Sequence, residues 1–259
     1  MGNAGDIEIN ASGIISFEIG ERRLFNRPSV ARTNVQSGAI GNGGNIKIEA
    51  DSLFLNDGGW LEAIVEASTE VRDSEDIPPG QGNSGNIDIN VRDKIVMSGL
   101  IEENIGDVAG TMSSANAGIS PELLSSGIIN NIDIGVTGDS GNIKVKADSL
   151  VLADGAQINS GNYCQLKSGN INLDINGLIS MGDAAKFTFR GSSSLINSAI
   201  LSQLGKDANG SGGNIDIQAG SISMLDISEI SASTFGEGNA GNISMHVNED
   251  ISVSELCSI

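Results

Sequence analysis

Apolar and polar residues alternate in a short pattern that returns seven times along the chain. Each copy has Gly, then Asn or Asp, then an apolar, a polar and a second apolar residue. Alternation with a period of two places both apolar side chains on one face of a β-strand, and Gly-Asn is typical of turns. The seven copies begin at Gly5, Gly44, Gly85, Gly141, Gly169, Gly213 and Gly241.

Two further alternating stretches follow each copy. The second begins nine or ten residues after the glycine, as at residues 53–55 and 150–152. The third begins at about the seventeenth residue and is clearest at residues 158–160 and 230–232. Asp-Gly turns at residues such as 154–155 separate the second stretch from the third. Each repeat therefore predicts three short strands.

The spacing of the copies predicts how the repeats are arranged. Successive motif glycines lie 39, 41, 56, 28, 44 and 28 residues apart, so the shortest unit has 28 residues and longer units contain insertions. Three short strands cannot bury their apolar faces alone, but stacked units can. We therefore predict an all-β fold, a parallel β-helix of about seven three-strand coils that forms one domain over residues 1–259. Insertions are expected at about 18–38, 65–83, 102–139 and 183–210.

The Asn of the repeated pattern has a structural explanation. Asn tolerates left-handed backbone geometry, and equivalent Asn side chains on stacked strands can hydrogen-bond in a ladder. We expect such a ladder, with Asp6 at its end, rather than a binding site. Its predicted members are Asn45, Asn86, Asn142, Asn170, Asn214 and Asn242.

Composition and charge narrow the function classes. The chain has 259 residues, with 33 acidic and 14 basic side chains and a formal net charge of −19. A chain this acidic is not expected to bind nucleic acid through a phosphate-neutralising surface. No apolar run is long enough to predict a membrane-spanning helix, and the two Cys argue against a disulfide scaffold. The N-terminal residues show no signal peptide.

The chemistry-bearing residues predict neither catalysis nor a cofactor. His246, the single His, occupies an outward position of an alternating strand. The glycines lack the Asp spacing of calcium-binding nonapeptide repeats, so no metal site is predicted. One basic cluster is a candidate for contact with glycans or an anionic surface, although a solvated loop is the favoured explanation. Its members are Arg22, Arg23, Arg27 and Arg32.

Three stretches of the repeats resemble a known family. They are Gly-Gly-Asn-Ile-x-Ile at 43–48, Ser-Leu-x-Leu-x-Asp-Gly-Ala-x-Ile at 149–158, and Ser-Ala-Ser-Thr-x-Gly-x-Gly-Asn-Ala-Gly-Asn-Ile at 231–243. They are similar to the repeats of filamentous haemagglutinin-like exoproteins of cyanobacterial type, the large secreted members of two-partner secretion systems. The resemblance implies a right-handed, single-stranded β-helix, adhesion rather than catalysis, and a place outside the cell or at its surface.

The resemblance also implies partners, and it leaves alternatives open. An outer-membrane transporter would export the full-length protein, and host or neighbouring cell surfaces or glycans would be its targets. Because the chain shows no separate secretion domain, we expect a repeat-region fragment of a larger exoprotein. The alternatives are a β-helical enzyme acting on polysaccharide, or the shaft of a secreted haemolysin or toxin. Three or more carboxylates converging with an Arg or Lys in a groove would favour the enzyme.

Overall fold

The computed structural model describes eight stretches of the chain. Within them it contains β-strands and no helix, which confirms the predicted all-β class. Most strands pair in parallel, as a solenoid of repeats requires. The described stretches are 2–18, 29–68, 77–100, 125–164, 166–189, 192–206, 208–254 and 256–259.

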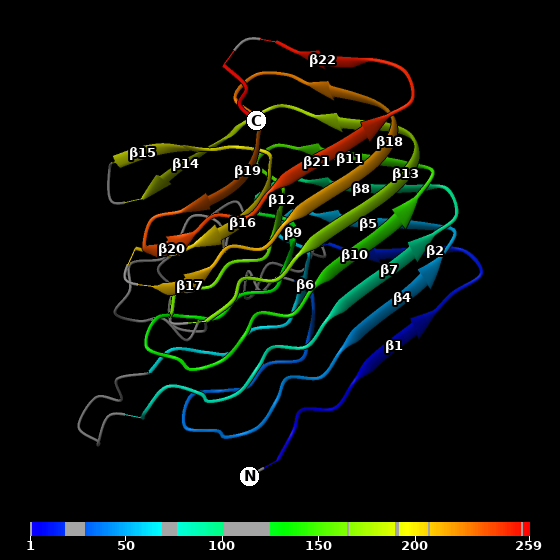
Figure 1. Cartoon of the computed structure of the whole chain (residues 1–259). Coiled ribbons are helices and arrows are strands. Elements are labelled where there is room, and N and C mark those ends of the chain that lie inside the picture. The colour runs from blue at the N-terminus through cyan, green and yellow to red at the C-terminus, as the bar shows by residue number, and fades with distance from the viewer. Residues whose placement is uncertain are drawn as a thin grey trace.

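The repeated Gly-Asn-Ile pattern forms one half of a 12-stranded sheet (Figure 1). Each strand pairs in parallel with its equivalent in the neighbouring repeats, and Ile46, for example, lies opposite both Ile7 and Ile87. The strands stack in chain order from the blue to the red end of Figure 1. They are β1 (Ile7–Asn10), β4 (Ile46–Ala50), β7 (Ile87–Val91), β10 (Ile143–Ala147), β13 (Ile171–Met181), β18 (Ile215–Met224) and β21 (Ile243–Val247).

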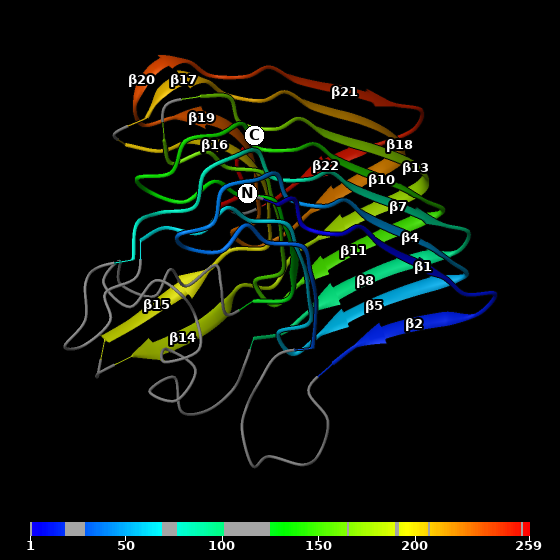
Figure 2. The same ribbon diagram turned by 90° about the horizontal axis from the view of Figure 1, so that it is seen from below.

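The second alternating stretches form the other half of the same sheet. They also pair in parallel, and Leu150 lies opposite Ile95 and Ile179. The long strands β13 and β18 run through both halves and join them. Figure 2 shows the two halves folded against each other in a curled sheet. The remaining strands of this half are β2 (Ile14–Phe17), β5 (Ser52–Asn56), β8 (Lys94–Ser98), β11 (Ser149–Ala153) and β22 (Ile251–Val253).

The third stretches form a separate six-stranded parallel sheet. Three of its strands lie inside ranges expected as insertions, namely 18–38, 102–139 and 183–210. Part of each of these ranges therefore belongs to the stack, and the insertions are shorter than predicted. Its strands are β3 (Val30–Arg32), β6 (Trp60–Glu62), β9 (Gly127–Ile129), β12 (Gln157–Asn159), β16 (Ala199–Leu204) and β19 (Glu229–Thr234).

Two smaller pairs complete the described strands. An antiparallel hairpin of β14 (Ala185–Phe189) and β15 (Ser192–Ile196) lies within the expected insertion 183–210. A short parallel pair joins β17 (Asn209–Ser211) to β20 (Glu237–Asn239). Most of the expected insertion 102–139, its first part through residue 124, lies outside the described residues.

The apolar core lies between the two halves of the large sheet and the six-stranded sheet. Aliphatic side chains from all three stacks pack there, and Ile87, Ile95 and Ile128 of one repeat are completely buried. Burying a side chain of this size contributes roughly 1.5–3 kcal/mol, and the stack repeats the contribution in each unit. The core thus accounts for the alternation that the sequence shows, and it leaves the outward positions to carry any function.

Candidate functional site

The motif asparagines form a continuous hydrogen-bonded ladder along the stack. In each step, the side-chain oxygen of one repeat accepts a hydrogen bond from the backbone N–H of the next motif Asn. The six N···Oδ1 distances run from 2.6 Å, where Asn45 donates to Asp6, to 2.9 Å. Direct bonds between side chains occur only in the first three steps, so the main interaction differs from the side-chain ladder that the sequence predicts. The side-chain oxygens of Asp6 and of every motif Asn before Asn242 are therefore engaged by the backbone of the next repeat.

A second ladder, which the sequence reading missed, lies three residues before the first. Asn3, Asn42 and Asn83 each accept a hydrogen bond from the backbone N–H of the equivalent residue in the next repeat, at 2.9–3.0 Å. Asp139 accepts one from Lys167 at 3.0 Å, where the ladder ends because Lys has no acceptor oxygen. The signal was present in the sequence as Asn or Asp three positions before the motif Asn.

A third polar line runs inside the fold. It consists of four buried polar residues, each of which directly follows a strand of the six-stranded sheet or lies in one. They are Thr33, Asn130, Ser160 and Ser202. Each donates a hydrogen bond to the carbonyl oxygen of a motif glycine, at 2.7–3.2 Å. Buried carbonyls need such partners. These polar residues are therefore structural, although an apolar pattern would not predict them.

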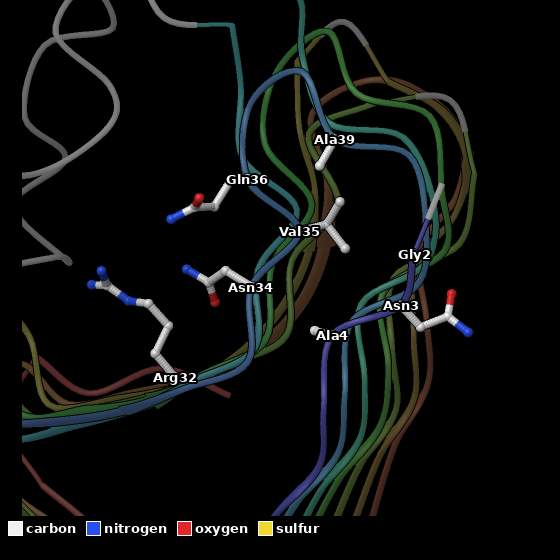
Figure 3. Close-up of a pocket in the computed structure, with 8 residues that line it drawn as sticks. All are labelled: Gly2, Asn3, Ala4, Arg32, Asn34, Val35, Gln36 and Ala39. Atoms are coloured by element: carbon white, nitrogen blue, oxygen red, sulfur yellow. The ribbon is translucent and has the colours of Figure 1, made fainter.

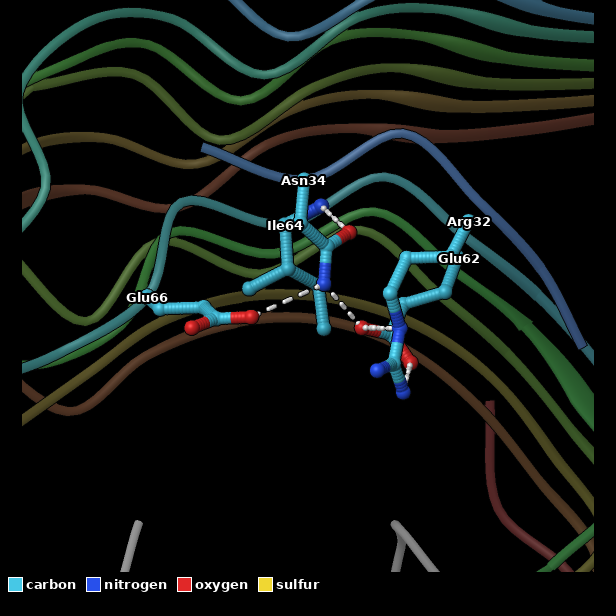
Figure 4. Close-up of polar contacts among 5 residues, drawn as sticks. All are labelled: Arg32, Asn34, Glu62, Ile64 and Glu66. Carbon is cyan, nitrogen blue, oxygen red and sulfur yellow. Dashed lines mark hydrogen bonds and ion pairs between the residues drawn. The ribbon is translucent and has the colours of Figure 1, made fainter. Parts of the chain in front are cut away.

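One group of charged side chains stands apart from these ladders. It lies on the outward face of β3 and β6 and is centred on Glu62, which is almost completely buried. The Arg32 guanidinium forms an ion pair with Glu62 at 3.0 Å, and the Asn34 amide donates to Glu62 and, at 3.3 Å, to Glu66 (Figure 4). The side-chain oxygen of Asn34 accepts the N–H of Ile64 at 3.0 Å. Arg32 and Asn34 thus hold two buried carboxylates of the neighbouring repeat.

Asp133 of the following repeat adds a third carboxylate to this group. Its Oδ2 accepts the backbone N–H of Ala67 at 3.2 Å. The pKa of Asp133 is raised to about 6, chiefly by burial and also by the negative charges of Glu66 and Glu62, against the lowering effect of the hydrogen bond from Ala67. We call Arg32, Asn34, Glu62, Glu66 and Asp133 the carboxylate cluster.

A cavity of about 330 Å³ adjoins this cluster. Arg32, Asn34 and Gln36 contribute to its lining and project to one side of the chain, whereas Val35 projects to the other (Figure 3). Residues before β1, including Asn3, line the opposite wall. Of the three carboxylates only Glu62 contacts Arg32, and neither Glu62 nor Glu66 lines the cavity.

The predicted basic cluster is only partly described. Arg32 is the one member within the described residues, and its guanidinium is engaged by Glu62. Arg22, Arg23 and Arg27 lie outside them. His246 is exposed on the outward face of β21, in line with its predicted position.

A second acidic group lies at the turns beside the hairpin. Asp154, Asp183 and Asp226 have left-handed backbone geometry, with φ of 51°, 51° and 54°, and line a cavity of about 440 Å³. Partial burial and the charges of Asp226 and Asp154 raise the pKa of Asp183. Among the described residues, no group of three or more His, Cys, Asp or Glu side chains is arranged to hold a metal ion.

Comparison with known proteins adds no relative. No protein-family model, curated protein or solved structure in the comparisons matches the chain. The part of the chain that the structure describes has no helix with the length and apolar character needed to cross a bilayer. Function must therefore be argued from the geometry and from the resemblance of the repeats.

Proposed function

We propose that the chain is a right-handed, single-stranded parallel β-helix that serves as the shaft of a secreted, adhesin-like exoprotein. The observation that supports this proposal best is the in-register pairing of each strand with its equivalents in the repeats on either side. Such a stack is rigid along its length and holds outward side chains at a fixed spacing of about 4.8 Å. A rigid shaft suits the display of contact surfaces.

The polar ladders support the same proposal. Both ladders use their side-chain oxygens to tie one repeat to the next, so they reinforce the stack instead of presenting a site. The proposed setting is the cell surface or the extracellular space, with an outer-membrane transporter as export partner and cell-surface glycans as targets. These partners rest on the resemblance of the repeats to filamentous haemagglutinin-like exoproteins.

Bead retention tests the adhesive role. The purified chain is coupled to fluorescent beads, which are washed over immobilised neutral, sulfated and uronic-acid polysaccharides and over intact bacterial cells. We expect retention on at least one surface, above that of beads coupled to an unrelated acidic protein of similar charge. Retention equal to the control on every surface would contradict the adhesive role.

A polysaccharide-acting enzyme is the second candidate, and the carboxylate cluster favours it. One of its three carboxylates, Glu62, pairs with Arg32, and Asp133 has a pKa suited to proton transfer near neutral pH. The burial of Glu62 and Glu66 and their bonds to Asn34 favour a structural role for the cluster. Release of reducing ends from polysaccharides, abolished in Asp133→Asn, would establish the enzyme instead of the shaft. We expect no release from either protein.

A further inference from the structure

The outward side of three neighbouring strands carries polar side chains that the fold leaves without partners. β12, β16 and β19 lie next to one another in the six-stranded sheet (Figure 1). Their inward residues Ile158, Ile200 and Ile230 are completely buried in the core, so alternation places the residues on either side of them outward. We call this outward side the amide face. Its residues are Gln157, Asn159, Ala199, Leu201, Gln203, Glu229, Ser231 and Ser233.

Four buried atoms on the amide face have no hydrogen-bond partner. They are Oδ1 and Nδ2 of Asn159, Oε1 of Gln157 and Oγ of Ser233. Every other buried side-chain nitrogen or oxygen of the described residues is hydrogen-bonded. Buried polar groups in folded proteins nearly always have a partner, so the concentration of these four atoms on one face points to a polar ligand that the face receives.

The amide face is closed at β12 and opens toward β19. Asn159 and Gln157 on β12 are 1% and 4% exposed, whereas Gln203 on β16 and Ser233 on β19 are half-buried. Within the described structure, the Gln203 side chain makes no hydrogen bond. Outward side chains stand perpendicular to a sheet, so a further repeat would lie beside β19 and would not cover them. A ligand can therefore approach along β16 and β19, and Asn159 lies at the inner end of this approach.

The chemistry of the amide face indicates the class of ligand. Glu229 is its one charged residue, whereas the outward side of β3 and β6 carries the ion pair of Arg32 with Glu62. Amides and hydroxyls both donate and accept hydrogen bonds, as the hydroxyl groups of a sugar do, and they offer no charge to an ionic ligand. The net charge of −19 further disfavours an acidic ligand. An uncharged, hydroxyl-rich polymer matches these properties.

We propose that the amide face binds a neutral polysaccharide. Hydroxyl groups of the sugar supply the hydrogen bonds that Asn159, Gln157 and Ser233 lack, and Gln203 binds a further hydroxyl group between them. Equivalent positions recur at about 4.8 Å along the stack, so a chain of sugar units that crosses β16 and β19 meets a polar side chain on each strand. This inference rests on the proposed adhesive function, and it adds the class of glycan and the residues that bind it.

Two substitutions alter the amide face without removing a side-chain hydrogen bond of the fold. Asn159→Leu replaces the unpartnered amide by an apolar side chain of similar size, and Gln203→Ala removes the half-buried amide. The matched controls are Asn172→Leu on β13 and Gln218→Ala on β18, which change exposed amides on the outward side of the large sheet. Each control has the same chemistry as its test variant and lies on a different face.

Affinity electrophoresis of the chain through native gels that contain a polysaccharide provides the test. Dextran and galactomannan are the neutral probes, and alginate is the acidic one. We expect at least one neutral probe, and not alginate, to retard the wild-type chain. Asn159→Leu and Gln203→Ala should each weaken this binding by about three- to tenfold, as the loss of one neutral hydrogen bond does, and both controls should bind as the wild type does. In urea unfolding, Asn159→Leu should be no less stable than the wild type, whereas a purely structural role would lower its stability.

Three results would overturn this inference. They are retardation by alginate alone, retardation by none of the three probes, and wild-type binding by both amide-face variants, which would mean that water supplies the missing hydrogen bonds. If Asn159→Leu does not fold, Gln203→Ala decides alone, since weaker binding than Gln218→Ala supports the inference and equal binding contradicts it. None of these results touches the adhesive role, because beads retained on cells or on acidic polysaccharides would still support it. Only beads retained on no surface would contradict that role.

Discussion

The outward face of the first strands and the outward face of the six-stranded sheet show two ways to place polar residues on one stack. On the outward face of β1, β4, β7 and β10, which we call the first-strand face, four charged residues follow one another in register and are all exposed. They are Glu8, Lys47, Asp88 and Lys144. On the outward face of the six-stranded sheet, which we call the third-strand face, the equivalent positions of β6 and β12 are all buried. They are Trp60, Glu62, Gln157 and Asn159.

The difference shows that exposure to solvent, rather than position in the strand pattern, determines whether an outward polar side chain needs a partner within the protein. An in-register parallel stack would place like charges side by side, and the first-strand face avoids this by alternating their sign. Water solvates the charged side chains of this face. The ion pairs of the first-strand face, such as Lys146 with Asp174 at 2.9 Å, are therefore exposed and weak. The buried positions of the third-strand face lack such solvation, so a polar group there depends on a protein partner.

Removal of Glu62 is the change with the largest expected effect on this comparison. Glu62→Ala leaves Arg32 and the Asn34 amide without their main partner, so we expect the free energy of unfolding to fall by about 2–4 kcal/mol. The exposed fraction of Arg32 keeps the loss below that of a fully buried pair. Urea unfolding measures it, with the exposed Glu8→Ala on the first-strand face as control, for which a far smaller loss is expected. Equal losses at the two sites would remove the distinction between the faces.

The raised pKa of Asp133 predicts that the free energy of unfolding depends on pH. Because its folded-state pKa is raised to about 6, the protonated form is favoured in the fold, and the stability that this provides is present below about pH 4 and lost as pH rises through 6. Asp133→Asn should therefore raise the free energy of unfolding at pH 7 by roughly 1–3 kcal/mol and leave it little changed at pH 4.

Urea unfolding at pH 4, 5.5 and 7 gives the slope that tests this expectation. Asp88→Asn on the first-strand face is the control for the loss of one negative charge. An Asp133→Asn variant that keeps the wild-type dependence between pH 4 and 7 would show that Asp133 is not the group responsible.

The sequence predicted the stack well because its signal repeats. Alternation at 87–89 and 95–97 marks strands whose apolar residues meet in the core, and the motif glycine sets the register of each repeat. The third strands were harder to locate, because β9 and β16 lie in long stretches that read as insertions. The carboxylate cluster could not be predicted, since Arg32, Glu62 and Asp133 come from three repeats of different length and share no motif. Only the fold brings them together.

Asn159 provides a smaller test of the same idea, with the opposite sign. It is 1% exposed, and neither its Oδ1 nor its Nδ2 has a hydrogen-bond partner within the described structure. Its neighbours in the row are the apolar Ile129 and Leu201. Asn159→Leu should therefore raise the free energy of unfolding by about 1–2 kcal/mol.

The matched control for this variant is Asn131→Leu on the same face. The Asn131 Oδ1 accepts the N–H of Gly161 at 2.7 Å, so its replacement should destabilise the protein by about 1–2 kcal/mol. Thermal and urea unfolding of both variants measure the difference. A loss of stability in Asn159→Leu equal to that in Asn131→Leu would mean that Asn159 has a partner in solution.

Lys146 on the first-strand face carries the smallest expected effect. Its ammonium group pairs with Asp174 at 2.9 Å, and both side chains are about half exposed. Because solvent screens this pair, Lys146→Met should change the free energy of unfolding by less than about 0.5 kcal/mol in low salt and by even less in 0.5 M NaCl. The variant removes the charge and keeps most of the aliphatic chain. A loss above about 1 kcal/mol that persists in high salt would show that the charges of this face stabilise the stack, and the contrast with the buried face would then be one of degree.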